Sequence, residues 1–142
     1  MSEMKVDVER DMAHPAAKVW AVLANFGDLS WAPGTERVEV LGDGIGMTRR
    51  IYMPGMDPID EVLEALDNEA CRLRYSIPRG LPMPLDDYQA TVRVEALPGG
   101  GSRIHWSARA QPRGIDAATA SGLMHGSYAQ MLDWLDTHLG TL

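Results

Sequence analysis

The last quarter of the chain carries a helical stripe that limits what the rest can fold into. Apolar residues recur at three- and four-residue steps from Leu123 to Leu139, the spacing of one face of an α-helix. The pattern predicts one amphipathic helix over residues 115–139. A helix this long needs an equally long apolar surface against it, because an uncovered stripe would leave large hydrophobic side chains in water.

The preceding residues are patterned to supply that surface as a sheet. Residues 4–12 place apolar side chains at nearly every even position, the period of a half-buried strand. A helical pattern follows over residues 14–26, and residues 28–34 allow one more short helix. Six further strands are predicted at residues 35–41, 45–53, 59–66, 70–77, 87–97 and 102–111.

This order predicts an α+β fold of two layers. A curved seven-stranded antiparallel sheet should wrap around the long C-terminal helix, with two short helices after the first strand. Such a sheet leaves space beside the helix unless bulky side chains fill it, so we expect a cavity between the layers. No repeat or linker interrupts the 142 residues, which predicts a single domain over 1–142.

Charge and composition argue against several functions. Thirteen Lys and Arg against twenty Asp and Glu give a net charge of −7, which disfavours nucleic acid as a partner. No apolar run approaches the roughly 20 residues of a transmembrane segment, and the charged start is unlike a secretory signal, so we expect a cytoplasmic protein. No zinc-ligand spacing or glycine-rich phosphate loop is present, so we expect no metal and no cofactor.

Sulfur-containing residues are prominent, with nine Met and one Cys beside four Trp and a single Phe. Met adapts its shape to what it contacts, so we expect Met and Trp to line or gate the cavity. Cys71 falls in the predicted strand 70–77 and cannot form an internal disulfide. A buried, reduced thiol is therefore expected there.

Arg49 and Glu61 fall on apolar faces of successive predicted strands. Either charge alone in an apolar interior would be costly, so the two should pair. The pair could anchor a carboxylate, carbonyl or hydroxyl of a ligand, or it could be a structural salt bridge at the rim of the sheet. The apolar residues that share these faces are Met47, Ile51 and Met53 beside Arg49, and Ile59 and Leu63 beside Glu61.

Three aromatic residues are further candidates. Tyr88 alternates with apolar residues along its strand, and a buried hydroxyl needs a partner, so it could donate a hydrogen bond to a ligand. Plain core packing is the alternative. Tyr75 shows the same alternation, and Trp106 shares its face with Ala108 and Ala110, which suggests a wall with room in front of it.

Seven segments, in this order, resemble the START-like or SRPBCC helix-grip superfamily, and within it the polyketide cyclase/dehydrase group and the plant abscisic-acid-receptor type. They are HPAAKVWAVLANFGDLSWAPG, GIGMTRRIYMPG, DEVLEALD, LRYSI, DDYQATVRV, SRIHWSA and QMLDWLDTHLG, and they cover almost the whole chain. The resemblance implies the helix-grip fold. It does not specify an activity, because the superfamily includes lipid carriers, hormone receptors, cyclases and chaperone cofactors.

The resemblance also implies which side chains face the cavity. Tyr88 faces it from the sheet, and Trp31, in a Trp-x-Pro match, could close one end. The proline-rich loops 54–58 and 78–84 take the places of the receptors' gate and latch loops without their sequences. On the last helix the resemblance directs Leu123, Ser127 and Met131 into the cavity, with Met124 and Tyr128 adjacent to them. As a separate hypothesis for ligand access, we expect the two loops to form a mobile entrance lined by Met53, Met56 and Met83.

These features predict a soluble domain that binds a small, largely apolar ligand, such as a lipid, a polyketide or another aromatic metabolite. Arg49, Glu61 and Tyr88 would orient its polar groups. The enzyme alternative is a polyketide cyclase or aromatase/dehydratase, in which Arg49 or Tyr88 polarises a carbonyl and Glu61 handles protons. A third alternative is an accessory protein for a partner or a quinone, acting through an exposed apolar patch. We expect a monomer or a weak homodimer.

Overall fold

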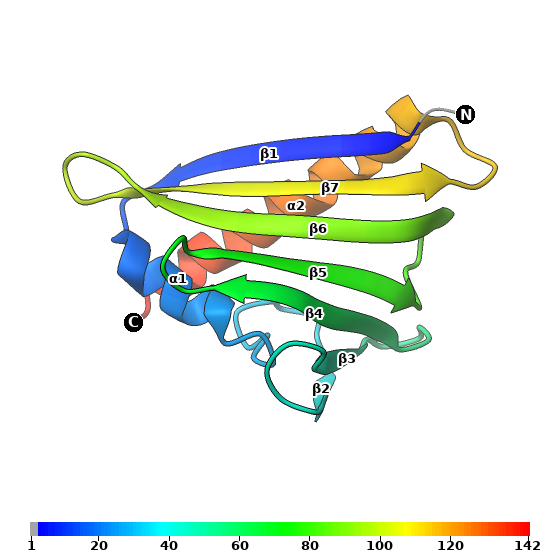
Figure 1. Ribbon diagram of the computed structural model, residues 1–142, viewed down its shortest axis with the longest axis horizontal. Coiled ribbons are helices and arrows are strands. Elements are labelled where there is room, and N and C mark those ends of the chain that lie inside the picture. Colours follow the sequence, from blue (N-terminus) through cyan, green and yellow to red (C-terminus); the bar gives the residue numbers. More distant parts are fainter. Residues whose placement is uncertain (1–2) are drawn as a thin grey trace.

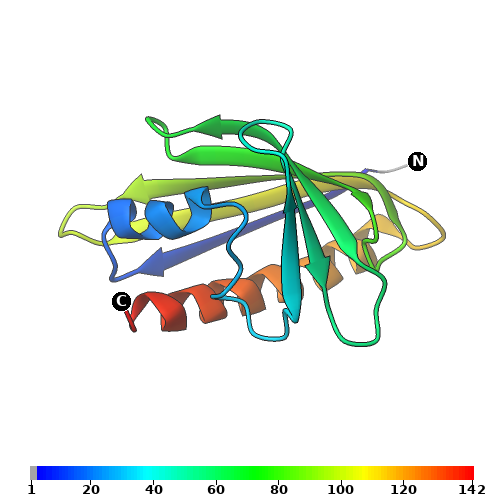
Figure 2. The same cartoon turned by 90° about the horizontal axis from the view of Figure 1, so that it is seen from below.

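The long C-terminal helix lies across one face of a single curved sheet in the computed structural model, which describes residues 3–142 (Figure 1, Figure 2). The helix, α2 (Ala117–Leu139), follows the last strand, and a short helix, α1 (Ala16–Ala24), follows the first. The strands are β1 (Met4–Met12), β2 (Arg37–Leu41), β3 (Thr48–Tyr52), β4 (Ile59–Asp67), β5 (Arg72–Arg79), β6 (Leu85–Ala96) and β7 (Ser102–Pro112).

All seven strands form one antiparallel sheet in the order β1-β7-β6-β5-β4-β3-β2. Strands β2 to β7 are a meander, and β1 completes the sheet by pairing with the free edge of β7. This arrangement confirms the predicted two-layer α+β architecture with seven strands and a long terminal helix. Its consequence for function is that α2 packs mainly against β1 and β7, so the opposite half of the concave face is less closely covered by the helix.

The second short helix predicted over residues 28–34 is not present. The segment forms turns instead: the amide of Ala32 donates to the Leu29 carbonyl at 2.9 Å, and the amide of Ser30 donates to Asp28 Oδ1 at 2.9 Å. The Asp28 side chain thus offers the backbone a partner that competes with helix formation. Pro33 and Gly34 then prevent the turns from extending into a helix.

The prediction that Cys71 is a buried strand residue is wrong. β5 begins only at Arg72, and Cys71 occupies the preceding turn with a φ of 52°, in the left-handed region that few non-glycine residues adopt. Its side chain is half-buried, and its Sγ contacts the carbonyl of Asn68 at 3.6 Å. The tight connection between β4 and β5 therefore overrides the alternating pattern at this position.

The core forms where the helical stripe meets the alternating strand residues. On β1 the buried side chains are Met4, Val6, Val8 and Met12, in agreement with the predicted period of two. Each large apolar side chain buried in this way stabilises the fold by roughly 1.5–3 kcal/mol. On α2 the buried side chains recur at steps of three and four and are Ala120, Met124, Tyr128, Leu132, Leu135 and Leu139.

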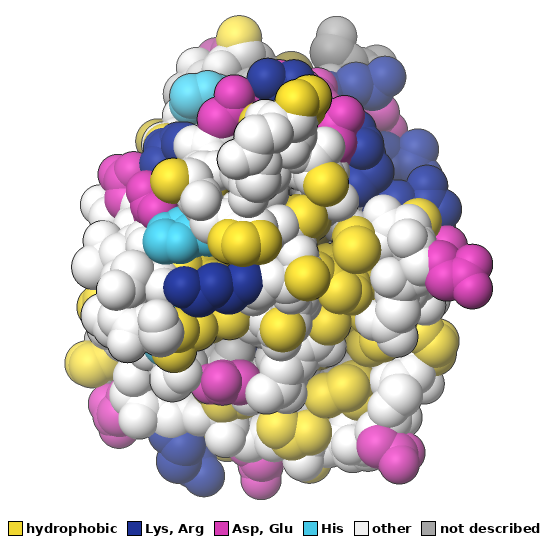
Figure 3. Space-filling view, turned by 90° about the vertical axis from the view of Figure 1, so that its left-hand side faces the viewer, with side chains coloured by type: hydrophobic (Ala, Val, Ile, Leu, Met, Phe, Trp, Pro, Cys, Tyr) yellow, Lys and Arg dark blue, Asp and Glu magenta, His cyan; other side chains and the backbone are white. Residues whose placement is uncertain are grey.

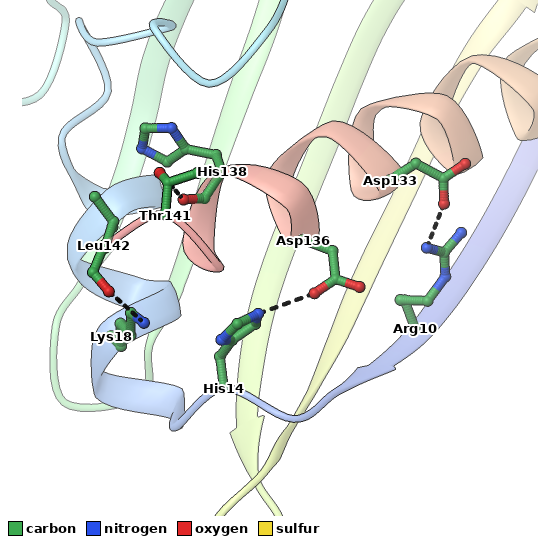
Figure 4. Close-up of polar contacts among 8 residues, drawn as sticks. All are labelled: Arg10, His14, Lys18, Asp133, Asp136, His138, Thr141 and Leu142. Carbon is green, nitrogen blue, oxygen red and sulfur yellow. Dashed lines mark hydrogen bonds and ion pairs between the residues drawn. The ribbon is translucent and has the colours of Figure 1, made fainter.

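Polar contacts fix the C-terminal half of α2 against β1 and the start of α1 (Figure 4). Arg10 Nη1 donates to Asp133 Oδ1 at 2.7 Å, and His14 Nε2 lies 2.9 Å from Asp136 Oδ1. These contacts join residues more than 100 positions apart in the chain, so they set the position of the helix along the sheet. At the other end, Asp116 caps α2 by accepting a hydrogen bond from the Thr119 amide at 2.8 Å.

Gly80 and Gly55 provide a test of how tightly the β5–β6 loop packs. Both have positive φ values, 88° and 74°, but a Cβ on Gly80 would lie 2.1 Å from the Pro58 carbonyl oxygen, whereas a Cβ on Gly55 would meet open space. Gly55→Ala should cost about 1–2 kcal/mol of unfolding free energy from the backbone conformation alone. Gly80→Ala should cost clearly more, as measured by urea unfolding. Equal losses would show that the loop has room to move.

Candidate functional site

A cavity of about 270 Å³ lies between the sheet and α2, on the half of the concave face that the helix covers less closely. This volume is near the lower end of the range of small-molecule pockets, roughly 300–1,000 Å³. Its apolar wall consists of Leu29, Ala32, Ile51, Met53, Ile59, Ile77, Leu81, Pro82, Met83, Met124, Met131 and Trp134. Its polar wall consists of Thr35, Arg49, Glu61, Tyr75, Tyr88, Ser127, Tyr128 and Gln130.

The predicted pairing of Arg49 with Glu61 is present in the cavity wall. The two residues face each other in the register of β3 and β4, and Arg49 Nε donates to Glu61 Oε1 at 2.7 Å. Arg49 Nη2 lies 2.6 Å from the same oxygen. Both residues are buried, with exposed fractions of 6% and 9%, so the pair has lost most of its hydration.

The remaining interactions of Arg49 are with the segment that follows α1. Its Nη1 donates to the carbonyl of Phe26 at 2.9 Å, and its guanidinium carbon lies 3.9 Å from the centroid of the Phe26 ring. The same carbon lies 5.3 Å from the centroid of the Tyr75 ring. These contacts anchor the chain after α1 to the sheet, a role that sequence patterns alone did not reveal.

The next residues along the same strands form a second ion pair on the opposite face of the sheet. Arg50 Nε donates to Asp60 Oδ1 at 2.8 Å, and the register of β3 and β4 sets these residues opposite each other. The hydrogen bond from Arg50 lowers the pKa of the Asp60 carboxyl below its ordinary value. Two successive Arg–acid pairs therefore hold β3 to β4, one from each face.

Two tyrosines extend the polar part of the wall. The Tyr75 hydroxyl accepts a hydrogen bond from Trp106 Nε1 at 3.3 Å, and the rings of Tyr75 and Tyr88 lie 6.5 Å apart. Burial raises the pKa of both hydroxyls above their ordinary value, and the negative charge of Glu61 raises them further. Both groups are therefore neutral at physiological pH, when each keeps a proton to donate.

Tyr128 contributes an aromatic ring to the wall from α2. Its ring stacks on Trp106 with a centroid distance of 5.4 Å and an interplanar angle of 29°. Its hydroxyl is buried and forms no hydrogen bond within residues 3–142. A buried hydroxyl without a partner costs stability, which makes this group a further candidate for contact with a bound molecule.

Most of the candidate residues from the sequence come together in this cavity. Arg49, Ile51, Met53, Glu61, Tyr75, Met83, Tyr88, Met124, Ser127, Tyr128 and Met131 all line it. Leu123 is placed at the cavity by the resemblance, but in the structure its side chain is half exposed and lies outside the cavity wall. Its place on the helix points it to solvent, one turn before Ser127.

Five other candidates also lie outside the cavity wall. Trp31 and Trp106 line a separate void of about 10 Å³ behind Arg49 and Tyr75. Leu63 is buried in the core, Met47 is half-buried beside it, and Met56 is 42% exposed. Of the three Met residues expected at the entrance, Met53 and Met83 reach the cavity and Met56 does not.

The residues that sequence reasoning missed come mainly from the loops and from α2. Leu29, Ala32 and Thr35 reach the cavity because the segment after α1 folds into turns over it, and no periodicity marks such a segment. Leu81 and Pro82 do so from the β5–β6 loop. Gln130 and Trp134 continue the helix face of Ser127 at steps of three and four, a signal that the sequence did contain.

Metal-binding clusters and membrane-spanning helices are not found in the part of the chain that the structure describes. Residues 3–142 contain no group of three or more His, Cys, Asp or Glu side chains arranged to hold a metal ion. Within the same range, neither helix has the length and apolar character required to cross a membrane.

Exposed large hydrophobic side chains occur near the β2–β3 turn, at Val40, Leu41 and Ile45. In the view of the α1 end, hydrophobic patches are interspersed with charged side chains (Figure 3).

The fold and the cavity agree with a match to a known protein family. Residues 3–140 match the family described as polyketide cyclase / dehydrase and lipid transport. The chain belongs to this family, as the resemblance in the sequence indicated. A comparison with curated protein sequences gave no match.

Solved structures share the whole architecture. The protein XoxI from Bacillus cereus superposes with a TM-score of 0.85 at 24% identity, over 96% of this chain and 95% of that chain. Norcoclaurine synthase from Thalictrum flavum, in complex with dopamine and hydroxybenzaldehyde, gives a TM-score of 0.75 at 20% identity, over 97% and 87%. The protein Ara h 8.0201 gives 0.79 at 16% identity, over 99% and 100%. These TM-scores establish a common fold, and at such low identities they establish the fold alone.

The energetic role of the Arg49–Glu61 pair can be measured by removing its members. Arg49→Met or Glu61→Leu alone should each cost about 3–5 kcal/mol of unfolding free energy, because the remaining charge is buried without its partner. The double variant should be less destabilised than the worse single variant in urea unfolding. Arg103→Ala, which removes the exposed pair with Asp11, should cost less than about 1 kcal/mol. If the losses of unfolding free energy in the two single variants simply add in the double variant, the two charges are not coupled.

The raised pKa values of Tyr75 and Tyr88 predict a loss of stability in alkali. Their stabilising effect is complete below pH 10, the ordinary pKa of tyrosine, and declines as the pH rises above it, because the unfolded chain ionises first. Each further pH unit should cost about 1.4 kcal/mol per buried tyrosine. Urea unfolding between pH 8 and pH 11 should show a smaller decline for Tyr88→Phe than for the unmodified chain. An identical decline in the two proteins would contradict a raised pKa for Tyr88.

Proposed function

We propose that this protein binds a small, largely apolar molecule in the cavity between the sheet and α2. The observation that carries the proposal is the cavity itself, in which apolar side chains form most of the wall and Arg49, Glu61, Tyr75 and Tyr88 form a polar group on the sheet side. A mostly apolar enclosure with a few convergent polar groups is typical of a small-molecule site. The apolar wall supplies affinity, and the polar group orients the ligand.

The comparisons support a ligand of this class. The family description includes both cyclase or dehydrase activity and lipid transport, and both involve substantially apolar molecules. Dopamine and hydroxybenzaldehyde, which are bound to norcoclaurine synthase, are small aromatic compounds. A small aromatic metabolite is therefore a suitable candidate class for a cavity of about 270 Å³.

Catalysis on a polyketide is the second candidate function, and the positions of Tyr88 and Glu61 in one cavity wall favour it. In a cyclisation or dehydration, a neutral Tyr88 could polarise a carbonyl while the Glu61 carboxylate accepts a proton. Arg49 would act by holding Glu61 in place rather than by reaching the substrate. A change in the mass of an incubated ligand would distinguish turnover from simple binding.

The entrance to the cavity is assigned, in the same proposal, to the β5–β6 loop and the end of β3. Met83 and Met53 contribute unbranched, adaptable side chains to the wall at these two places. Leu81 and Pro82 lie beside Met83 in the loop, and together these residues would have to move for a ligand to enter.

Filling the cavity from α2 tests ligand binding directly. Ser127→Trp would project an indole into the cavity, whereas Leu123→Trp would place the same group on the exposed side of the helix one turn earlier. N-phenyl-1-naphthylamine, a neutral apolar fluorophore, should gain fluorescence with the unmodified chain and with Leu123→Trp. Its affinity should fall about tenfold or more with Ser127→Trp, because the new side chain occupies its volume. Equal affinities for all three proteins would place the probe elsewhere.

A further inference from the structure

The Arg49–Glu61 pair leaves one carboxylate oxygen available to a ligand. The contacts from Arg49, at 2.7 Å and 2.6 Å, both end on Glu61 Oε1. Within residues 3–142, Glu61 Oε2 accepts no hydrogen bond, although Glu61 lines the cavity. A carboxylate can accept hydrogen bonds on both oxygens, so Glu61 retains capacity to accept one from a bound molecule.

The Tyr88 hydroxyl is the complementary group. Tyr88 lines the same cavity and is 2% exposed, and its hydroxyl interacts with the Tyr75 hydroxyl, which also accepts a hydrogen bond from Trp106 Nε1. Both tyrosines stay protonated, and a hydrogen bond between their hydroxyls uses only one of the two protons, so the pair keeps one proton to donate to a ligand. The wall therefore presents a free acceptor on Glu61 and a donor on the Tyr75–Tyr88 pair, besides the unpartnered hydroxyl of Tyr128.

Arg49, by contrast, has little capacity left for an anionic ligand. Its Nε and Nη2 face Glu61, its Nη1 donates to the Phe26 carbonyl, and the guanidinium is stacked on the Phe26 ring. The positive charge is balanced by Glu61. A ligand carboxylate placed beside this pair would gain no net counter-charge and would be repelled by Glu61 in a site of low polarity.

We propose that the cavity selects neutral ligands that carry a hydroxyl group and discriminates against carboxylates. The ligand hydroxyl donates to Glu61 Oε2 and accepts from the Tyr88 hydroxyl, so a single ligand group contacts both residues. A carbonyl satisfies Tyr88 alone, and a carboxylate satisfies Tyr88 while facing the charge of Glu61. This inference rests on the proposed function, since it concerns the polar end of the same cavity.

Three naphthalene compounds of similar size test the inference by calorimetry at pH 7. The probes are 2-naphthol, which is neutral at this pH, 2-naphthoate, which is an anion, and naphthalene, which has no polar group. In the unmodified chain, 2-naphthol should bind about tenfold or more tightly than 2-naphthoate, as expected for hydrogen bonds that include a charged partner. It should also bind more tightly than naphthalene.

Two variants identify the groups responsible. Glu61→Gln removes the negative charge and leaves that of Arg49 unbalanced, so the preference for 2-naphthol over 2-naphthoate should fall about tenfold or reverse. Tyr88→Phe should weaken 2-naphthol several-fold and leave naphthalene unchanged. Circular dichroism melting confirms that each variant is folded. If Glu61→Gln does not fold, the selection for neutral hydroxyl compounds is still tested by Tyr88→Phe and by the three-probe comparison in the unmodified chain.

The outcomes separate this inference from the function on which it rests. Equal or tighter binding of 2-naphthoate by the unmodified chain overturns the selection for neutral hydroxyl compounds. Unchanged preference in a folded Glu61→Gln variant also overturns it. Binding of naphthalene with no gain for 2-naphthol overturns the hydrogen-bonding role alone and leaves an apolar binding cavity. Failure of all three compounds and of N-phenyl-1-naphthylamine overturns the proposed function, and this inference with it.

Discussion

The buried ion pair between Arg49 and Glu61 organises the half of the molecule that contains the cavity. Two charges on the concave face of a sheet are costly to dehydrate, and they persist there only if their hydrogen bonds are well satisfied. Arg49 meets this condition by contacting Glu61 on the neighbouring strand and the Phe26 carbonyl after α1. The same contacts fix the register of β3 with β4 and attach the chain after α1 to both, so a wall of the cavity is held rigid.

The cavity itself follows from how a straight helix meets a curved sheet. α2 packs mainly against β1 and β7, and polar contacts from Arg10 and His14 hold its C-terminal half near β1 and α1 (Figure 4). Strands β3 to β5 curve away on the other side, and the side chains of residues 3–142 leave a cavity in the resulting space. The opening is instead covered by the turns after α1 and by the β5–β6 loop, which are the parts of the fold least defined by regular structure.

The periodic parts of the structure could be read from the sequence, and the irregular parts could not. The alternation in β1 and the apolar stripe on α2 each arise because one face of the element packs against the core, so both could be predicted. Arg49 and Glu61 were paired correctly because an isolated charge on an apolar face has few other solutions. Periodicity did not predict the orientation of Leu123, which depends on the rotation of the helix. It also did not predict the turns at residues 28–34 and at Cys71, whose geometry is decided by tertiary contacts. Four Met residues line the cavity, at 53, 83, 124 and 131, but Met56 shows that composition alone does not place a side chain.

The distribution of tryptophan gives this protein a built-in optical probe. Trp134 lines the cavity, whereas Trp20, Trp31 and Trp106 lie outside its wall. Indole emission depends on the polarity of its immediate surroundings, so an occupant of the cavity would alter the spectrum of one tryptophan out of four directly. Trp106 is coupled more remotely, because its ring stacks on Tyr128 and its Nε1 donates to Tyr75, and both tyrosines line the cavity. The indoles thus link the occupancy of the site to a signal that requires no label.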